Sequence, residues 1–131
     1  MTTGSHIEAW KDAISAAILG NPPTLTYDEP VPAGVDEFTR ITVTRAARER
    51  PWACGIRGAL GWRLTTECVS TLRGNAQDMR DDLMRLQDRP LPQIDSTLLE
   101  PDGEWDDPEK DADGYWTASA AWLYFAPNPY H

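Results

Sequence analysis

Histidine and cysteine are scarce in this 131-residue chain, which contains two residues of each type. His6 and His131 lie near the two chain ends, a poor place for a catalytic base that a shell of neighbours must hold. Cys54 and Cys68 do not have a metal-ligand spacing, and in a cytosolic protein both are expected to be reduced thiols. No Ser-His-Asp or Cys-His arrangement with an orienting group is present. The sequence therefore predicts that the protein is not an enzyme.

Long apolar runs are absent as well. No stretch approaches the roughly 20 apolar residues that span a bilayer, and residues 1–9 lack the basic start and apolar stretch of a secretory signal. A protein made in the cytoplasm, with no membrane partner, is therefore expected. Residues 54–58 contain two glycines but lack the Lys and the Ser or Thr of a phosphate-binding loop, so no cofactor is predicted.

The composition is that of one globular domain covering residues 1–131. Hydrophobic residues make up 40% of the chain and charged residues 25%, which are ordinary values for a folded protein. A chain of this length buries enough surface to fold without a metal or a disulfide framework. The 11 prolines and 9 glycines predict many loops.

The net charge of −9 is unevenly distributed. Residues 40–73 contain seven arginines and two glutamates, a net charge of +5, whereas residues 100–131 contain eight acidic residues and one lysine, a net charge of −7. Such a chain has a polarised surface suited to head-to-tail self-association, although solvated charge runs would give the same sequence. The overall pI near 4.5 argues against tight binding to free DNA.

Two segments are predicted to be helices. In Ser5–Leu19 the apolar residues follow helical spacing, and Ser5 with Glu8 matches a capping box. Asn75–Arg89 begins with a good N-cap and ends before Pro90. The residues expected to cover one face of the sheet are Trp10, Ile14, Met79, Leu83 and Leu86.

Four segments are predicted to be strands: Thr39–Ala46, Leu60–Leu72, a short strand running from Leu98 toward Trp105, and Tyr115–Phe125. The longer ones alternate apolar and polar residues, as expected for an antiparallel sheet with one covered side. The element order α-β-β-α-β-β predicts an α+β fold with a four-stranded, mainly antiparallel sheet and two helices packed on one face.

The segment Ala47–Ala59 is too long for a tight hairpin turn and is predicted to be a loop that contacts a partner. Trp and Arg are favoured anchors of protein interfaces. The interface residues predicted here are Arg48, Arg50, Trp52 and Arg57.

A second predicted loop, Asp106–Gly114, is strongly acidic. Its residues 109–114 imitate the start of an EF-hand, but the twelfth position would be Ala120 instead of the glutamate that closes such a site. A dedicated calcium site is therefore not predicted. The candidate functional residues in this loop are Asp106, Asp107, Asp111 and Asp113.

The layout resembles the bacteriophage tail terminator family, also called tail completion or head-to-tail joining proteins. The resemblance includes an amphipathic N-terminal helix with Trp10, a proline-rich connector (Tyr27-Asp28-Glu29-Pro30), and a long strand (residues 61–70) that leads into the Asn75–Leu86 helix. It also includes the aromatic last strand. The family pattern does not include the acidic insertion or the proline-rich tail.

The resemblance implies a homohexameric ring in the virion, assembled in the host cytoplasm. Such a ring would cap the major tail tube protein and present a surface to the head-tail connector proteins, with DNA only passing through the lumen. The four aspartates of the acidic loop would then face the channel or form ion pairs between subunits. Alternatives are a head-closure or neck connector protein of the same particle, a small acidic inhibitor-type binding protein, and a small hydrolase or transferase that uses loop carboxylates.

Overall fold

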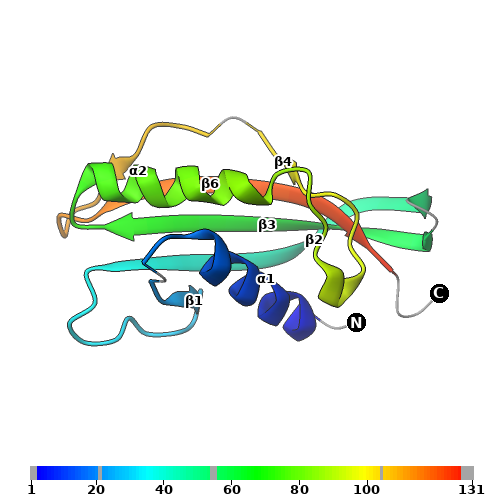
Figure 1. Cartoon of the computed structure of the whole chain (residues 1–131), viewed down its shortest axis with the longest axis horizontal. Coiled ribbons are helices and arrows are strands. Elements are labelled where there is room, and N and C mark those ends of the chain that lie inside the picture. The colour runs from blue at the N-terminus through cyan, green and yellow to red at the C-terminus, as the bar shows by residue number, and fades with distance from the viewer. Residues whose placement is uncertain (1–2, 21, 54–55, 104, 128–131) are drawn as a thin grey trace.

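The computed structural model describes residues 3–20, 22–53, 56–103 and 105–127, with only the backbone for Thr3, residues 47–53 and residues 56–59. The chain forms one layer of β-sheet with the helices packed on one side of it (Figure 1). The described elements are α1 (Thr3–Ala17), β1 (Thr24–Thr26), β2 (Glu37–Ala53), β3 (Ile56–Ser70), α2 (Arg73–Asp82), the 3₁₀ turns η1 (Leu83–Leu86) and η2 (Pro92–Ile94), β4 (Glu100–Pro101), β5 (Glu109–Lys110) and β6 (Trp116–Ala126). None of the described helices is both long and apolar enough to cross a membrane.

The prediction of an α+β fold with two helices is confirmed, but the four-stranded sheet is wrong. The described strands form a six-stranded mixed sheet in the order β1-β2-β3-β6-β4, with β5 also paired to β6. β1 runs parallel to β2, whereas the other pairs are antiparallel. β1, β4 and β5 have only two or three residues each, too few for an alternating pattern to be recognised in the sequence.

The main core lies between the helices and one face of the sheet. Residues that share this face are aligned across β2, β3 and β6, as in the row Ile41, Thr66 and Ala120. Both helices bury apolar side chains against it, so the predicted packing of the helices on one face is confirmed. The core residues of the helical layer include Trp10, Ile14, Met79, Leu83 and the partly buried Leu86.

The opposite face of the sheet has a small apolar cluster and is otherwise polar. Leu25, Phe38 and Val69 form this cluster where the connector folds over the end of the sheet. Further along β2 and β3 the residues on this face are hydroxylated or charged, and Thr42 and Arg63 are exposed. The sheet thus has one covered face and one open face.

The boundaries of the helices differ from the predicted ones. α1 begins at Thr3, so Ser5 lies within its first turn instead of capping it. α2 begins at Arg73 after Leu72, and the Asn75 side chain donates a hydrogen bond to Glu37 Oε1 (2.6 Å) instead of capping the helix. After Asp82 the chain tightens into the 3₁₀ turn η1, which brings Leu83 fully into the core.

Candidate subunit-contact elements

The predicted loop Ala47–Ala59 is instead a two-stranded ribbon. Its backbone belongs to β2 and β3, which pair from Glu49 opposite Leu60 to Ala53 opposite Ile56, with a register shift between Arg45 and Glu49. The loop was predicted because the segment is too long for a tight hairpin turn, whereas β2 and β3 themselves continue through it as far as Ala53 and Ile56. The side chains of Arg48, Arg50, Trp52 and Arg57 lie outside the described part of the structure, so their role as interface residues stays a prediction.

The ribbon extends beyond the body of the molecule. β6 ends at Ala126, which pairs with Leu60, so neither β6 nor the helices accompany β2 and β3 further (Figure 1). At roughly 3.3 Å per residue, the unaccompanied strand segment from Glu49 to Ala53 reaches about 13 Å. An isolated two-stranded hairpin is only marginally stable in water. A ribbon of this kind is therefore well suited to gain stability by contacting another surface.

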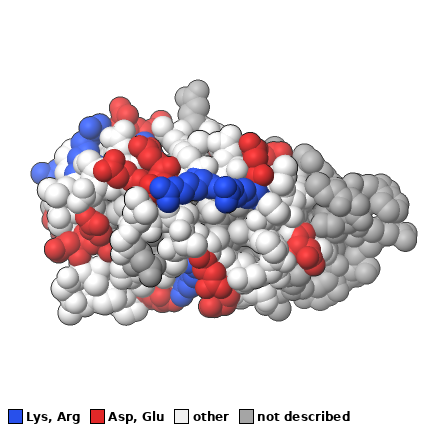
Figure 2. All heavy atoms as spheres, viewed as in Figure 1, with Lys and Arg blue, Asp and Glu red and all other residues white. Residues whose placement is uncertain are grey.

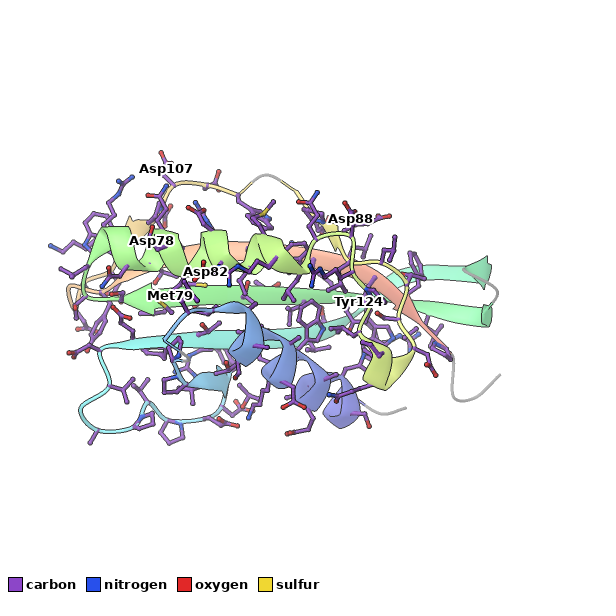
Figure 3. All side chains as sticks on the ribbon, viewed as in Figure 1. Asp78, Met79, Asp82, Asp88, Asp107 and Tyr124 are labelled. Atoms are coloured by element: carbon purple, nitrogen blue, oxygen red, sulfur yellow. The ribbon has the colours of Figure 1, made fainter. Side chains whose placement is uncertain are left out.

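The acidic segment, residues 100–113, runs along the outer edge of β6, across the sheet from β2. β4 pairs with Leu123 and Trp122, and β5 pairs with Thr117 and Trp116. Between these two short strands a hollow of about 330 Å³ opens at the edge of β6 and on the open face. The exposed Asp106 and Asp107 line this hollow, and Figure 3 shows Asp107 beyond α2 on the loop that follows this edge.

Arg63 is the basic side chain in this hollow. Its Nε lies 2.8 Å from Asp102 Oδ2, which ties the open face of β3 to the acidic segment. No ion pair involving Asp106 or Asp107 occurs within the described residues. Their charges are therefore available to a basic group from outside.

A buried arginine anchors the acidic segment, and sequence reasoning missed it. Arg80 of α2 is only 6% exposed, and its guanidinium donates hydrogen bonds to the carbonyl oxygens of Asp106 and Ser119. The Ser119 carbonyl is on the outer edge of β6, in the gap between β4 and β5. Arg80 thus donates a hydrogen bond to a carbonyl that would otherwise be unpaired at the edge of the strand. The helical spacing of Arg80 four residues after Ala76 could have indicated its burial.

Asp111 and Asp113 lie at a different place from Asp106 and Asp107. The Asp111 carboxylate accepts hydrogen bonds from the amides of Asp113 and Tyr115 (both 2.9 Å), which shapes the turn between β5 and β6. The four aspartates therefore do not form one cluster. Among the residues the structure describes, no three His, Cys, Asp or Glu side chains come close enough together to hold a metal ion.

The connector before β2 is held in shape by one guanidinium. Arg40 Nη1 donates hydrogen bonds to the carbonyl oxygens of Thr26, Tyr27 and Glu29 at 2.8–3.0 Å. Glu29 also pairs with Lys11 of α1 at 2.7 Å, and this contact lowers the pKa of Glu29. The exposed Tyr27 is thereby presented on an ordered loop.

His6 is part of the core, which its position near the chain end did not suggest. The ring is fully buried, stacks on Trp62 with a centroid distance of 4.0 Å, and has Nδ1 2.7 Å from the Tyr124 hydroxyl. Burial lowers the pKa of His6 from 6.5 to about 4, and it raises the pKa of Tyr124. Figure 3 shows Tyr124 in the half of the sheet nearer the ribbon. These groups stabilise the packing of α1 on β6.

The strand with most of the arginines and the acidic segment lie on opposite sides of the sheet. Four of the seven arginines of residues 40–73 belong to β2, and the acidic residues 100–113 follow the outer edge of β6. β3 lies between these strands. On the helix-bearing face, by contrast, basic and acidic side chains are interspersed (Figure 2). β2 also contains Glu37 and Glu49, so the two sides of the sheet differ in arginine content more than in net charge.

Comparison with known proteins identifies the fold and no more. A solved structure, whose given name states no function, is similar over 98% of this chain and 97% of its own length. The TM-score is 0.63 and the sequence identity 15%. No model of a protein family matches the chain, and no curated protein sequence matches it. At this identity the likeness shows that the α+β architecture occurs in another protein of the same extent.

Proposed function

We propose that the protein is a structural subunit of a phage tail terminator ring. In this role six copies form a ring that caps the tail tube and joins it to the head connector. Its partners are further copies of the chain, the major tail tube protein and the connector proteins, while DNA passes through the lumen. The ring acts in the virion after assembly in the host cytoplasm, and the role requires neither a catalytic residue nor a cofactor.

The observation that carries this proposal is the placement of the arginine-rich strand β2 and the acidic residues 100–113 on opposite sides of one sheet. A ring needs one patch on each subunit to meet a different patch on its neighbour. The arginine-rich β2 side and the acidic β6 side form such a pair, because one attracts the other and each repels its own kind. The same arrangement disfavours twofold dimers that would bring two like-charged sides together.

The projecting ribbon and the clamped connector support the same role. Both extend from the body as backbone-ordered elements, the ribbon through strand pairing and the connector through Arg40. A subunit that must contact a tube on one side, a connector on another and two neighbours needs several separate contact elements. In this chain the ribbon and the connector are such elements, and the main core lies on one face of the sheet only.

The proposal predicts that a major tail tube protein is encoded in the same genome, and it is tested with that protein. Native mass spectrometry of the purified protein, alone and with tubes of that protein, should show assemblies of six copies. Electron microscopy should show added density at one tube end and tubes of limited length. Tubes that grow equally long with and without the protein, together with no bound copies, would refute the proposal.

Neutralising the acidic segment separates two roles within the ring. A variant with Asn at positions 106, 107, 111 and 113 should fail to assemble if these aspartates bind the arginines of a neighbour. If they face the channel, the ring should form and DNA passage should slow. The matched control carries Asp78→Asn and Asp81→Asn on the exposed side of α2. Normal assembly and DNA passage in both variants would show that the loop serves neither purpose.

A further inference from the structure

A groove of about 410 Å³ lies between α1 and the chain that follows α2. Its α1 wall is formed by alanines, among them Ala13 and Ala16, and its other wall includes Leu86 and Pro90. Ala16 and Pro90 are exposed, and Ala13 and Leu86 are partly exposed. The groove therefore presents a mainly apolar surface to the solvent.

Two arginines also line this groove. Among the described residues Arg89 has no ion pair, and Arg85 has only a distant one, with 3.9 Å between Nη2 and Asp82 Oδ1. The other charged residue of the lining, Asp12, accepts a hydrogen bond from Gln93 Nε2 at 3.0 Å. In a chain with a net charge of −9, this groove thus combines an apolar surface with guanidinium groups that are available to a carboxylate from outside.

The connector between β1 and β2 has the complementary composition. Tyr27 is 73% exposed and Val31 is 39% exposed, and the exposed Asp28 follows Tyr27 directly. Asp28 has no ion pair within the described part of the chain. Arg40 binds the carbonyl oxygens of Tyr27 and Glu29, on both sides of Asp28, and so fixes the backbone here. An aromatic side chain on a preorganised backbone is a favourable interface anchor.

The connector and the groove lie on opposite sides of α1. Glu29 of the connector pairs with Lys11, whereas Ala9 and Ala13 line the groove. Each of these alanines is two residues from Lys11, which corresponds to about 200° around a helix of 3.6 residues per turn. Figure 1 shows α1 between the connector (cyan) and the turn η2 (yellow-green). Because Arg40 holds it on the far side of the helix, the connector does not reach the groove of its own chain.

We propose that the connector of one copy docks in the groove of the next copy, with Tyr27 against the apolar walls and Asp28 beside Arg85 and Arg89. This inference rests on the proposed ring and names one contact that builds it. Docking removes the exposed apolar area of Tyr27 and Val31 from water and pairs a carboxylate with guanidinium groups. Because two different surfaces meet, the contact is head to tail, and its repetition can close a ring.

Two variants, each lacking one half of the contact, test the inference in the full-length protein. Tyr27→Ala removes the anchor and keeps the groove, whereas Ala16→Trp fills the groove and keeps the connector. Both positions are exposed, so both variants should fold, which circular dichroism checks. In analytical ultracentrifugation each variant alone should associate at least about tenfold more weakly than the wild type. Mixed together they should form one-to-one dimers and nothing larger, because only one intact connector and one intact groove remain.

Charge reversal tests the position of Asp28. Asp28→Arg should weaken association at least about tenfold, because it brings a third cation to Arg85 and Arg89. The double variant Asp28→Arg with Arg89→Asp should recover most of this loss. A double variant that associates no more tightly than Asp28→Arg alone would overturn the proposed docking.

Leu72→Ala is the matched control, because Leu72 is 60% exposed and belongs neither to the groove nor to the connector. It should associate as the wild type does. Unchanged association of Tyr27→Ala or Ala16→Trp, an equal loss in Leu72→Ala, or a wild type that stays monomeric at every concentration would overturn the inference. So would normal self-association of Tyr27→Ala with a loss of tube capping, which would make the tube protein the occupant of the contact. Tube capping by the wild type remains an independent test of the proposed function.

Discussion

The free energy of unfolding should fall steeply between about pH 7 and pH 4 because of His6. Burial lowers the pKa of this imidazole from 6.5 to about 4. The unfolded chain takes up the proton near pH 6.5 and the folded chain only near pH 4, so acid favours the unfolded state over that interval. At about 1.4 kcal/mol per pH unit, the interval amounts to roughly 3 kcal/mol. Above pH 6.5 the contribution of His6 should not change with pH.

Urea denaturation of the wild type and of His6→Phe at several pH values measures this effect. Phenylalanine retains an aromatic ring against Trp62 but cannot take up a proton. The variant loses the contact with Tyr124, which should lower its free energy of unfolding by the same amount at every pH. The titration of the carboxylates is common to both proteins. The wild type should therefore lose roughly 3 kcal/mol more than the variant on going from pH 7 to pH 4. Parallel curves over the whole range would refute the assignment of His6 as a buried neutral group.

Two further predictions concern the helical layer and the acidic segment. Leu83→Ala should lower the unfolding free energy by roughly 2–5 kcal/mol, because the side chain is fully buried in the core; a loss below about 1 kcal/mol in chemical denaturation would place Leu83 at the surface. Arg80→Met should accelerate amide exchange of residues 102–108 by releasing the Asp106 carbonyl, while exchange in α1 stays unchanged. Identical exchange of residues 102–108 in wild type and variant would show that Arg80 does not anchor this segment.

The sequence was most informative where one period extended over many residues. Alternation along β3 and β6 indicated which residues face the core, and Leu64, Cys68 and Trp122 are all buried there. Helical spacing likewise predicted the packing of Trp10 and Ile14. In each case the burial of apolar side chains against a large neighbouring surface contributes most to stability. The pattern of apolar residues is therefore sufficient to predict which residues are buried.

The failures have local physical causes. The ribbon was mistaken for a loop because residues 47–59 were taken to be too long for a hairpin turn, although the two strands continue through most of them. Arg80 was not identified from the sequence because charged side chains are rarely buried, yet backbone carbonyls provide its partners. His6 precedes Trp10 by four residues and so shares its helical face, a signal that its place near the chain end obscured.

The contact between His6 and Tyr124 also constrains how the chain can fold. It joins residues 118 positions apart, and β6 pairs with β3 along its whole length. Contacts of such long sequence separation carry a high loop-closure entropy and slow the folding reaction. While β6 is still inside the ribosome, the core of the nascent chain lacks this strand. α1 and β3 then cannot bury their apolar faces. Folding should therefore be largely post-translational, and truncations that remove β6 should leave a chain that aggregates instead of a smaller folded domain.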